Sequence, residues 1–143
     1  MRFIRYTLLI TIIIALTGVK ASAKTAITPK GYMFGFVANF SDSVVYITDI
    51  QTVDSVWYDT KSKFLLGRST YANQLRDYFS EKLDMPHRTC IVVFALTRKE
   101  IEKKYLKMKK LYTVKYKGRY DVKNVNENDF HFTSVNLTPE DDL

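Results

Sequence analysis

The sequence predicts an α+β fold, a two-layer sandwich in which two helices pack on a mixed four- or five-stranded sheet. Three observations support it: an alternating aromatic run near the start of the domain, two amphipathic segments, and an apolar β-branched run between them. The elements follow the order ββαβαβ in a single domain, residues 32–138. Two helices suffice to cover one face of such a sheet.

The first 23 residues have the regions of a cleavable secretory signal peptide. Arg2 and Arg5 give a positive start, an apolar run follows over residues 8–16, and Ala21 and Ala23 fit a cleavage site. The apolar run is shorter than the roughly 20 residues that a membrane-spanning helix needs. We therefore expect cleavage after Ala23, no integral membrane segment in the mature chain, and a periplasmic or secreted location.

The mature chain would have the size of one domain with one core. It would contain nineteen Lys or Arg residues and fifteen Asp or Glu, so it would be less basic than the full chain, whose formal charge is +7. Cys90 is the only cysteine, and no intramolecular disulfide can form. Stability must then come from packing.

The domain is predicted to open with a β-hairpin behind a short arm. Polar residues 24–31 form the N-terminal arm. Aromatic side chains alternate along residues 32–40, and after a Ser-Asp-Ser turn a β-rich run covers residues 44–51. Residues 53–58 extend this second strand or form a further one. The aromatic stripe expected beneath the helices consists of Tyr32, Phe34, Phe36 and Phe40.

The first helix is predicted over residues 71–83, where apolar side chains recur at three- and four-residue spacing. Ser69 or Thr70 would cap its first turn. Residues 90–96 then form an unbroken apolar run rich in β-branched side chains. Such a run is typical of a strand covered on both faces, or of a central strand.

The second helix starts with a capping box, in which Thr97 and Glu100 each satisfy a free backbone N–H. It is expected to run to about Tyr112. Leu106 is apolar but falls outside the buried stripe of this helix, and the periodicity does not explain it.

The C-terminal part is less regular. Residues 113–116 could form a short strand, and residues 117–129 are mostly polar. Apolar and polar side chains alternate over residues 130–135, which predicts the closing strand. Residues 139–143 form an acidic tail.

The densest charge lies between residues 98 and 119, which contain ten Lys or Arg residues and two Glu. Tyr105, Tyr112 and Tyr116 are interleaved with them, and Tyr120 follows directly. Basic side chains attract polyanions, and tyrosines can stack on bases or sugars. An ordinary solvated helix face has the same composition. The candidate binding patch consists of Lys103, Lys104, Lys107, Lys110, Lys115 and Lys117.

Few residues could support catalysis or hold a metal. His87 and Cys90 have a spacing found within zinc sites, but a structural zinc site needs four ligands and His131 lies far along the chain. A cysteine that opens an apolar strand is more often a buried, inert thiol. We name no catalytic residue, metal ligand or cofactor.

Four aspartates recur in the first part of the domain, at positions that do not fit a calcium-binding loop. Asp42 is interpreted as a turn residue and Asp59 as a loop residue. Asp49 lies on a predicted strand and is the candidate for burial, and Asp54 completes the series. The sequence contains neither a nucleophile elbow nor a glycine-rich phosphate loop.

The predicted signal peptide and the runs Ala38–Ser43, Val45–Gln51 and Arg88–Phe94, ahead of a lysine-rich helix, look like those of small exported proteins of gut Bacteroidota. This resemblance implies export and a small α+β fold, and it implies no activity. The alternation of short strands and helices is also similar to the peptidoglycan-binding sporulation-related repeat domain, but the internal duplication of that domain is not visible.

These observations favour a non-enzymatic exported domain that binds an envelope protein or glycan through an exposed sheet face or the basic segment. A small periplasmic hydrolase using His87 or an aspartate is one alternative. A polyanion-binding protein that uses residues 98–119 is the other. Export disfavours nucleic acid as a partner.

Overall fold

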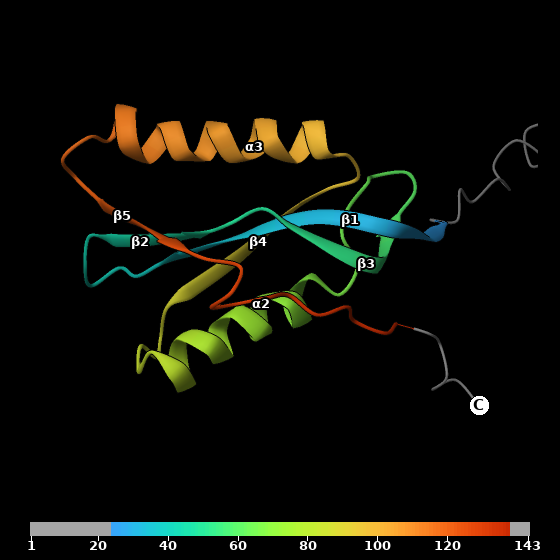
Figure 1. Ribbon diagram of the computed structural model, residues 1–143, viewed down its shortest axis with the longest axis horizontal. Helices are drawn as coiled ribbons and strands as arrows, with labels where there is room; N and C mark the ends of the chain where they lie inside the picture. Colours follow the sequence, from blue (N-terminus) through green and yellow to red (C-terminus); the bar gives the residue numbers. More distant parts are fainter. Residues whose placement is uncertain (1–23, 138–143) are drawn as a thin grey trace, which may run out of the picture.

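The computed structural model describes residues 24–137 (Figure 1). The predicted signal peptide and the acidic tail lie outside this range. The described elements are β1 (Thr25–Ala38), β2 (Val44–Thr48), β3 (Gln51–Asp59), α2 (Arg68–Asp77), β4 (Thr89–Ala95), α3 (Arg98–Lys110) and β5 (Asp121–Val125). Each helix ends in a π-helical turn, η1 (Tyr78–Lys82) after α2 and η2 (Leu111–Lys115) after α3. The α+β class, the mixed five-stranded sheet, its two helices and their order are confirmed.

The sheet is built around β1. β4 runs antiparallel along one edge of β1, while β2 and β3 follow one another along the opposite edge. β5 adds parallel to β2. Phe36 of β1 pairs with Ile47, and Met33 of β1 pairs with Gln51. The segment from Ile47 to Gln51 is one residue longer than the opposite segment of β1, so a β-bulge separates β2 from β3.

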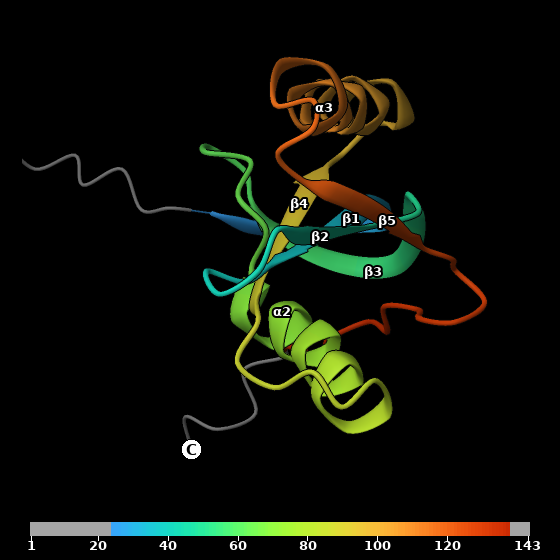
Figure 2. The same ribbon diagram turned by 90° about the vertical axis from the view of Figure 1, so that its left-hand side faces the viewer.

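The two helices cover opposite faces of the sheet (Figures 1 and 2). Alternate side chains of β1 serve the two sides: Met33 and Val37 belong to the core with α2, whereas Phe34 and Phe36 belong to the core with α3. The helices therefore form a layer on each side of the sheet, and the expected two-layer arrangement is corrected in this respect.

The direction of the strands explains this layering. β3 and β4 pair antiparallel with β1. β5 also runs antiparallel to β1, because it is parallel to β2, which pairs antiparallel with β1. The connection through α2 crosses β1 to reach β4, and the connection through α3 returns across the sheet to β5. Crossover connections between parallel strands are almost always right-handed. Two right-handed crossovers that traverse the sheet in opposite directions must therefore pass over opposite faces of it.

The predicted N-terminal arm is wrong, because residues 25–31 belong to β1. This part of β1 pairs with β3, beginning with Thr25 opposite Asp59. Pro29 falls at a gap in the ladder, opposite Ser55, whose φ of 53° interrupts the regular strand. Proline has no N–H to donate to β3, and the interruption at Ser55 removes the regular ladder bond at this position.

The helix starts follow the sequence only in part. Gly67 takes the N-cap position of α2 with φ 69°, and Ser69 and Thr70 lie within the first turn instead of at the cap. α3 begins as predicted, since the Thr97 hydroxyl accepts the backbone N–H of Glu100 at 3.2 Å. Neither helix of the described chain combines the length and the apolar character of a membrane span.

The end of the chain differs most from its prediction. β5 lies within the stretch expected to be a polar loop, and residues 113–115 belong to η2. Residues 130–135 form no strand, so the predicted closing strand is wrong. Their alternation arises because Phe130 and Phe132 are buried in the core on the α2 side.

Gln51 ties this C-terminal segment to the sheet. Its side chain is fully buried; Nε2 donates to the Phe130 carbonyl at 2.9 Å, and Oε1 accepts the Phe132 N–H at 2.7 Å. Gln74 of α2 makes the same pair of bonds to the backbone of Thr133, both at 2.9 Å. Two glutamine side chains thus make the backbone hydrogen bonds that a neighbouring strand would otherwise make.

Candidate functional site

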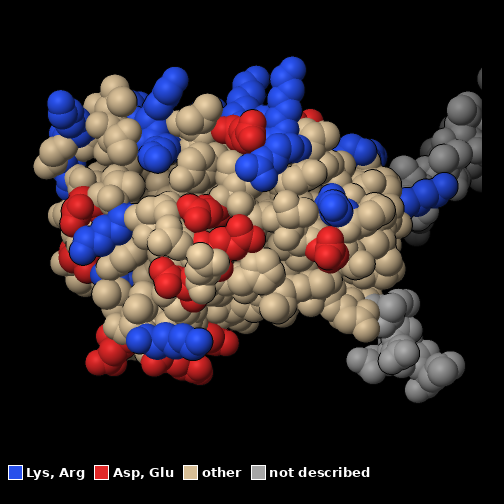
Figure 3. Space-filling model, in the orientation of Figure 1, with Lys and Arg blue, Asp and Glu red and all other residues tan. Residues whose placement is uncertain are grey.

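α3, η2 and the loop after them present a strongly basic surface. All ten Lys and Arg residues between 98 and 119 are exposed, including the six candidate lysines. Figure 3 shows Lys and Arg side chains gathered over α3, with most of the acidic side chains in view lower on the molecule. The rest of the described chain carries nine Lys or Arg and ten Asp or Glu, so its charges nearly cancel. The positive charge of the domain is therefore concentrated on this surface, which we call the basic face.

Most charges of the basic face are not neutralised. Arg98 pairs with Glu102 at 2.9 Å, with both side chains about half exposed. Lys104 Nζ donates to the carbonyl of Phe94 in β4 at 3.0 Å, and Lys109 lies over the ring of Tyr105. Among the described residues, no lysine of the basic face pairs with a carboxylate. The surface is therefore suited to attract an anionic partner.

Apolar side chains are exposed among and beside these lysines. Leu106 is 53% exposed on α3, and Val114 is 69% exposed on η2. The exposure of Leu106 accounts for its place outside the buried stripe. Ile91 on β4 is 44% exposed, and Phe40, which was expected beneath the helices, is fully exposed. Exposed apolar groups of this kind are typical of surfaces that contact another protein.

Two hollows follow one another along β4 on the side of α3. One has a volume of about 300 Å³ and is lined by Val93, Lys104, Lys107, Met108 and Leu111. The other has a volume of about 260 Å³ and extends from β4 over β1 to β2; it is lined by Phe36, Ala38, Asn39, Phe40, Val45, Thr89, Ile91, Tyr112 and Tyr120. Thr89, Ile91 and Val93 are alternate residues of one strand, so their side chains point to the same face. We call the two hollows together the β4–α3 groove.

The tyrosines of the basic face mainly contact one another. The rings of Tyr112, Tyr116 and Tyr120 pack pairwise edge to face, with centroids 5.1 to 6.0 Å apart. Burial, and then the neighbouring Tyr120 and Tyr116, raise the pKa of Tyr112. Lys115 and Arg119 both lie over the Tyr116 ring. This arrangement leaves less ring surface for stacking on bases or sugars than the sequence indicates.

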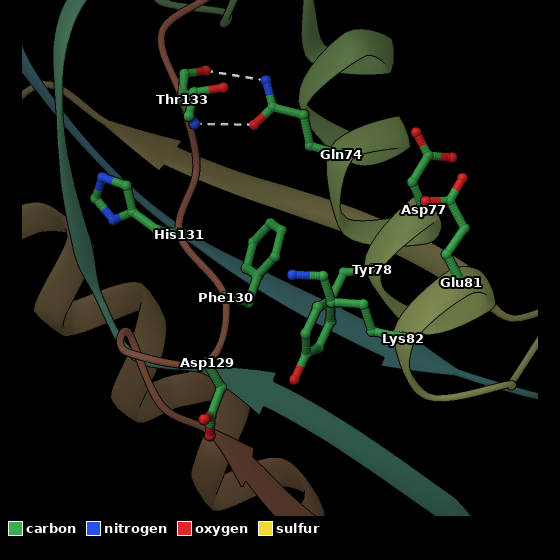
Figure 4. Close-up of a pocket in the computed structure, with 9 residues that line it drawn as sticks. All are labelled: Gln74, Asp77, Tyr78, Glu81, Lys82, Asp129, Phe130, His131 and Thr133. Atoms are coloured by element: carbon green, nitrogen blue, oxygen red, sulfur yellow. Dashed lines mark hydrogen bonds between the residues drawn. The ribbon is translucent and has the colours of Figure 1, made fainter.

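A further hollow of about 350 Å³ lies between α2 with η1 and the C-terminal segment (Figure 4). Asp77 and Glu81 project from the far side of the helix and do not point toward His131. His131 Nδ1 instead lies 3.6 Å from the carboxylate of Glu127. Within residues 24–137 no three His, Cys, Asp or Glu side chains are grouped to hold a metal ion. The carboxylates and the imidazole of this hollow do not converge on one point.

The structure does not bring His87 and Cys90 together as a nucleophile and its base. Cys90 is buried in the core on the α2 side, and this burial raises the pKa of its thiol. His87 is exposed in the preceding loop with φ 68°. In the described chain, no hydrogen bond joins Cys90 to a histidine; its sulfur lies 3.9 Å from the carbonyl of Arg88.

Three of the four aspartates have structural partners. Asp42 is a turn residue as predicted: it accepts the Val44 N–H at 3.0 Å and pairs with Arg88 at 2.7 Å. The hydrogen bond from Val44, together with Arg88, holds the pKa of Asp42 below its usual value. Asp59 accepts two backbone N–H groups of the loop that follows it, which lowers its pKa. Asp49 is only half-buried, and its carboxylate accepts hydrogen bonds from the Asn124 side chain in β5 and from the Glu127 N–H just after β5.

The sequence identified the basic lysines but missed the β4–α3 groove. The groove depends on the contact of α3 with β4, which no local pattern encodes. The misplaced apolar side chain of Leu106 signals an exposed apolar group on α3, but it does not line the groove. Comparisons with models of protein families, with curated proteins and with solved structures found no match.

Proposed function

We propose that this domain is a non-enzymatic binding module that recognises an acidic protein through the basic face and the β4–α3 groove. One observation carries the proposal: an excess of eight positive charges on residues 98–119 is exposed together with apolar side chains. Charge speeds the encounter with an anionic partner, and buried apolar area then holds it.

The apolar groups favour a protein over a nucleic acid or an acidic glycan. Leu106 and Val114 project among the lysines, where a hydrated phosphate or sugar chain gains nothing from them. The mutual packing of three tyrosines reduces the aromatic surface for stacking, although Tyr120 is still 40% exposed. A folded or extended protein with acidic and apolar side chains can use both kinds of contact. The predicted export would place this partner in the cell envelope or outside the cell.

The test is affinity capture with two matched variants. In the first, four exposed lysines of the basic face whose side chains make no hydrogen bond, ion pair or ring contact within residues 24–137 are replaced: Lys103, Lys107, Lys110 and Lys117→Gln. In the control, four exposed lysines elsewhere are replaced: Lys24, Lys30, Lys61 and Lys82→Gln. Both variants lose the same formal charge. Full-length tagged chains are expressed in the cells that make the protein, crosslinked, and recovered at low and high salt for mass spectrometry.

We expect the wild type and the control to retain the same acidic protein, with part of it still retained at high salt. The basic-face variant should retain at least about tenfold less, which corresponds to roughly 1.4 kcal/mol. Recovery of polyanions alone, all released at high salt, would contradict the proposal in favour of polyanion binding. Equal recovery by the two variants would show that the basic face is an ordinary solvated surface.

A further inference from the structure

We propose that the acidic partner binds as an added β-strand on the open edge of β4, with its alternate apolar side chains in the β4–α3 groove. This inference rests on the proposed function and specifies how the partner is held. Strand addition draws affinity from main-chain hydrogen bonds and specificity from pockets for alternate side chains.

The hydrogen bonds of β1 show which backbone groups of β4 face outward. The N–H of Gly35 donates to the Thr48 hydroxyl at 2.8 Å, so this part of β1 points its backbone toward β2. Val92 of β4 lies directly opposite Gly35. Two residues directly opposite each other in an antiparallel pair either hydrogen-bond to each other through their backbone groups or both point these groups away from each other. Because Gly35 points away from β4, Val92 directs its N–H and carbonyl to the open edge.

The other even-numbered residues of β4 follow the same alternation. Cys90 and Phe94 lie two residues from Val92, and the carbonyl of Phe94 indeed accepts from Lys104. A lysine that blocks an edge carbonyl is a common way to limit strand pairing. Lys104 therefore closes one end of the edge. Within residues 24–137, β4 pairs with no strand except β1, so Cys90 and Val92 remain for an incoming strand.

The groove matches the period of a bound strand. Its two hollows contain Ile91 and Val93 of β4, which are two residues apart. That separation corresponds to roughly 6.6 Å along a strand, the same spacing as alternate side chains of an added strand. Two successive inward side chains of the ligand would thus lie beside Ile91 and Val93, each at the β4 side of one hollow. The hollows are lined mainly by apolar side chains, which selects apolar groups at these positions.

The charge around the groove selects acidic residues elsewhere in the ligand. Lys104 and Lys107 line one hollow directly, and the remaining lysines of the basic face are exposed on α3, on η2 and in the loop after them. The same charge disfavours a second copy of this chain as the occupant. Antiparallel pairing of two β4 edges about a twofold axis would put both α3 helices on the same face, where ten Lys or Arg from each copy would repel.

The probe is a short synthetic peptide in which Glu and Val alternate, and the control peptide has the same composition in two blocks. We expect the alternating peptide to bind at least about tenfold more tightly. NMR hydrogen exchange on the full chain should show that the peptide slows exchange at the Cys90 and Val92 amides. Binding without protection of these amides would overturn strand addition. Protection that instead grows with protein concentration alone would show self-pairing and would also overturn it.

A substitution in the groove separates this inference from the proposed function. Ile91→Glu adds a repulsive carboxylate to an exposed position in the groove, and Ile27→Glu is the matched control on an exposed position of β1. We expect only Ile91→Glu to weaken the alternating peptide, by at least about tenfold. If Ile91→Glu leaves both the peptide and the captured protein unaffected while the four-lysine variant loses the protein, strand addition fails and the proposed function stands.

Discussion

Replacement of Gln51 by Leu should detach the C-terminal segment from the sheet at a large cost in stability. The two side chains have similar volume, so the change removes hydrogen bonds without opening a large cavity. Gln51 is fully buried, and the Phe130 carbonyl and Phe132 N–H that it satisfies belong to residues in the same core. The variant would leave both backbone groups without their partner.

The expected size follows from the cost of an unsatisfied buried group, about 1–3 kcal/mol for each donor or acceptor. Two such groups give a loss of about 2–6 kcal/mol in the free energy of unfolding, part of which the added apolar burial of Leu offsets. We therefore expect a net loss of about 2–5 kcal/mol, a large share of the stability of a small domain.

Gln74→Leu is the matched control. Gln74 makes the same two backbone hydrogen bonds to Thr133, but this site lies at the surface, where water can replace the amide. The expected loss is about 1 kcal/mol or less. Burial, and not the number of bonds, thus distinguishes the two variants.

Urea unfolding measures both variants. Trp57 is the only tryptophan and is half-buried in β3, so its fluorescence reports on the sheet. A smaller slope of free energy against urea for Gln51→Leu would indicate that the segment has already detached before global unfolding. Equal losses for the two variants, within about 0.5 kcal/mol, would refute the reasoning.

Three further predictions concern single sites. A Cβ at Gly35 would meet the buried side chain of Leu75 in α2, so Gly35→Ala should cost about 1–3 kcal/mol, and an unchanged melting temperature would contradict this. Burial raises the pKa of the Cys90 thiol, so iodoacetamide should alkylate it slowly in the native protein and rapidly in urea; equal rates would show an accessible thiol. The pKa of Asp42 is lowered by folding, so its contribution is present above its unfolded pKa of about 3.8 and is lost as the pH falls further. Asp42→Asn should therefore be less stable than the wild type at pH 7 and equally stable near pH 2, and a difference that persists at low pH would argue against the Arg88 pair.

The sequence predicted those elements whose signals are local. The capping box at Thr97 and the three- and four-residue spacing in the first amphipathic segment both correspond to helices. The apolar run that became β4 contributes side chains to the core on each face of the sheet, as its composition indicated, although β4 lies at an edge and Ile91 is exposed. Local patterns also predicted that the lysines of the basic face are exposed.

The features that the sequence did not reveal depend on contacts between distant segments. The layering follows from strand directions, which are set only when β3, β4 and β5 join one sheet. The alternation of Phe130 and Phe132 is the same in a strand and in an extended segment held by Gln51, seventy-nine residues away from Phe130. The β4–α3 groove likewise exists only once α3 has packed beside β4.

Site-specific photocrosslinking tests the central claim most directly. A photoreactive residue at Leu106, which is 53% exposed within the basic face, is compared with one at Phe64, which is 65% exposed outside it. The proposal predicts a discrete protein adduct at Leu106 in the cells that make the protein, and none at Phe64. A discrete adduct at Phe64 with none at Leu106 would contradict it and place the binding surface elsewhere.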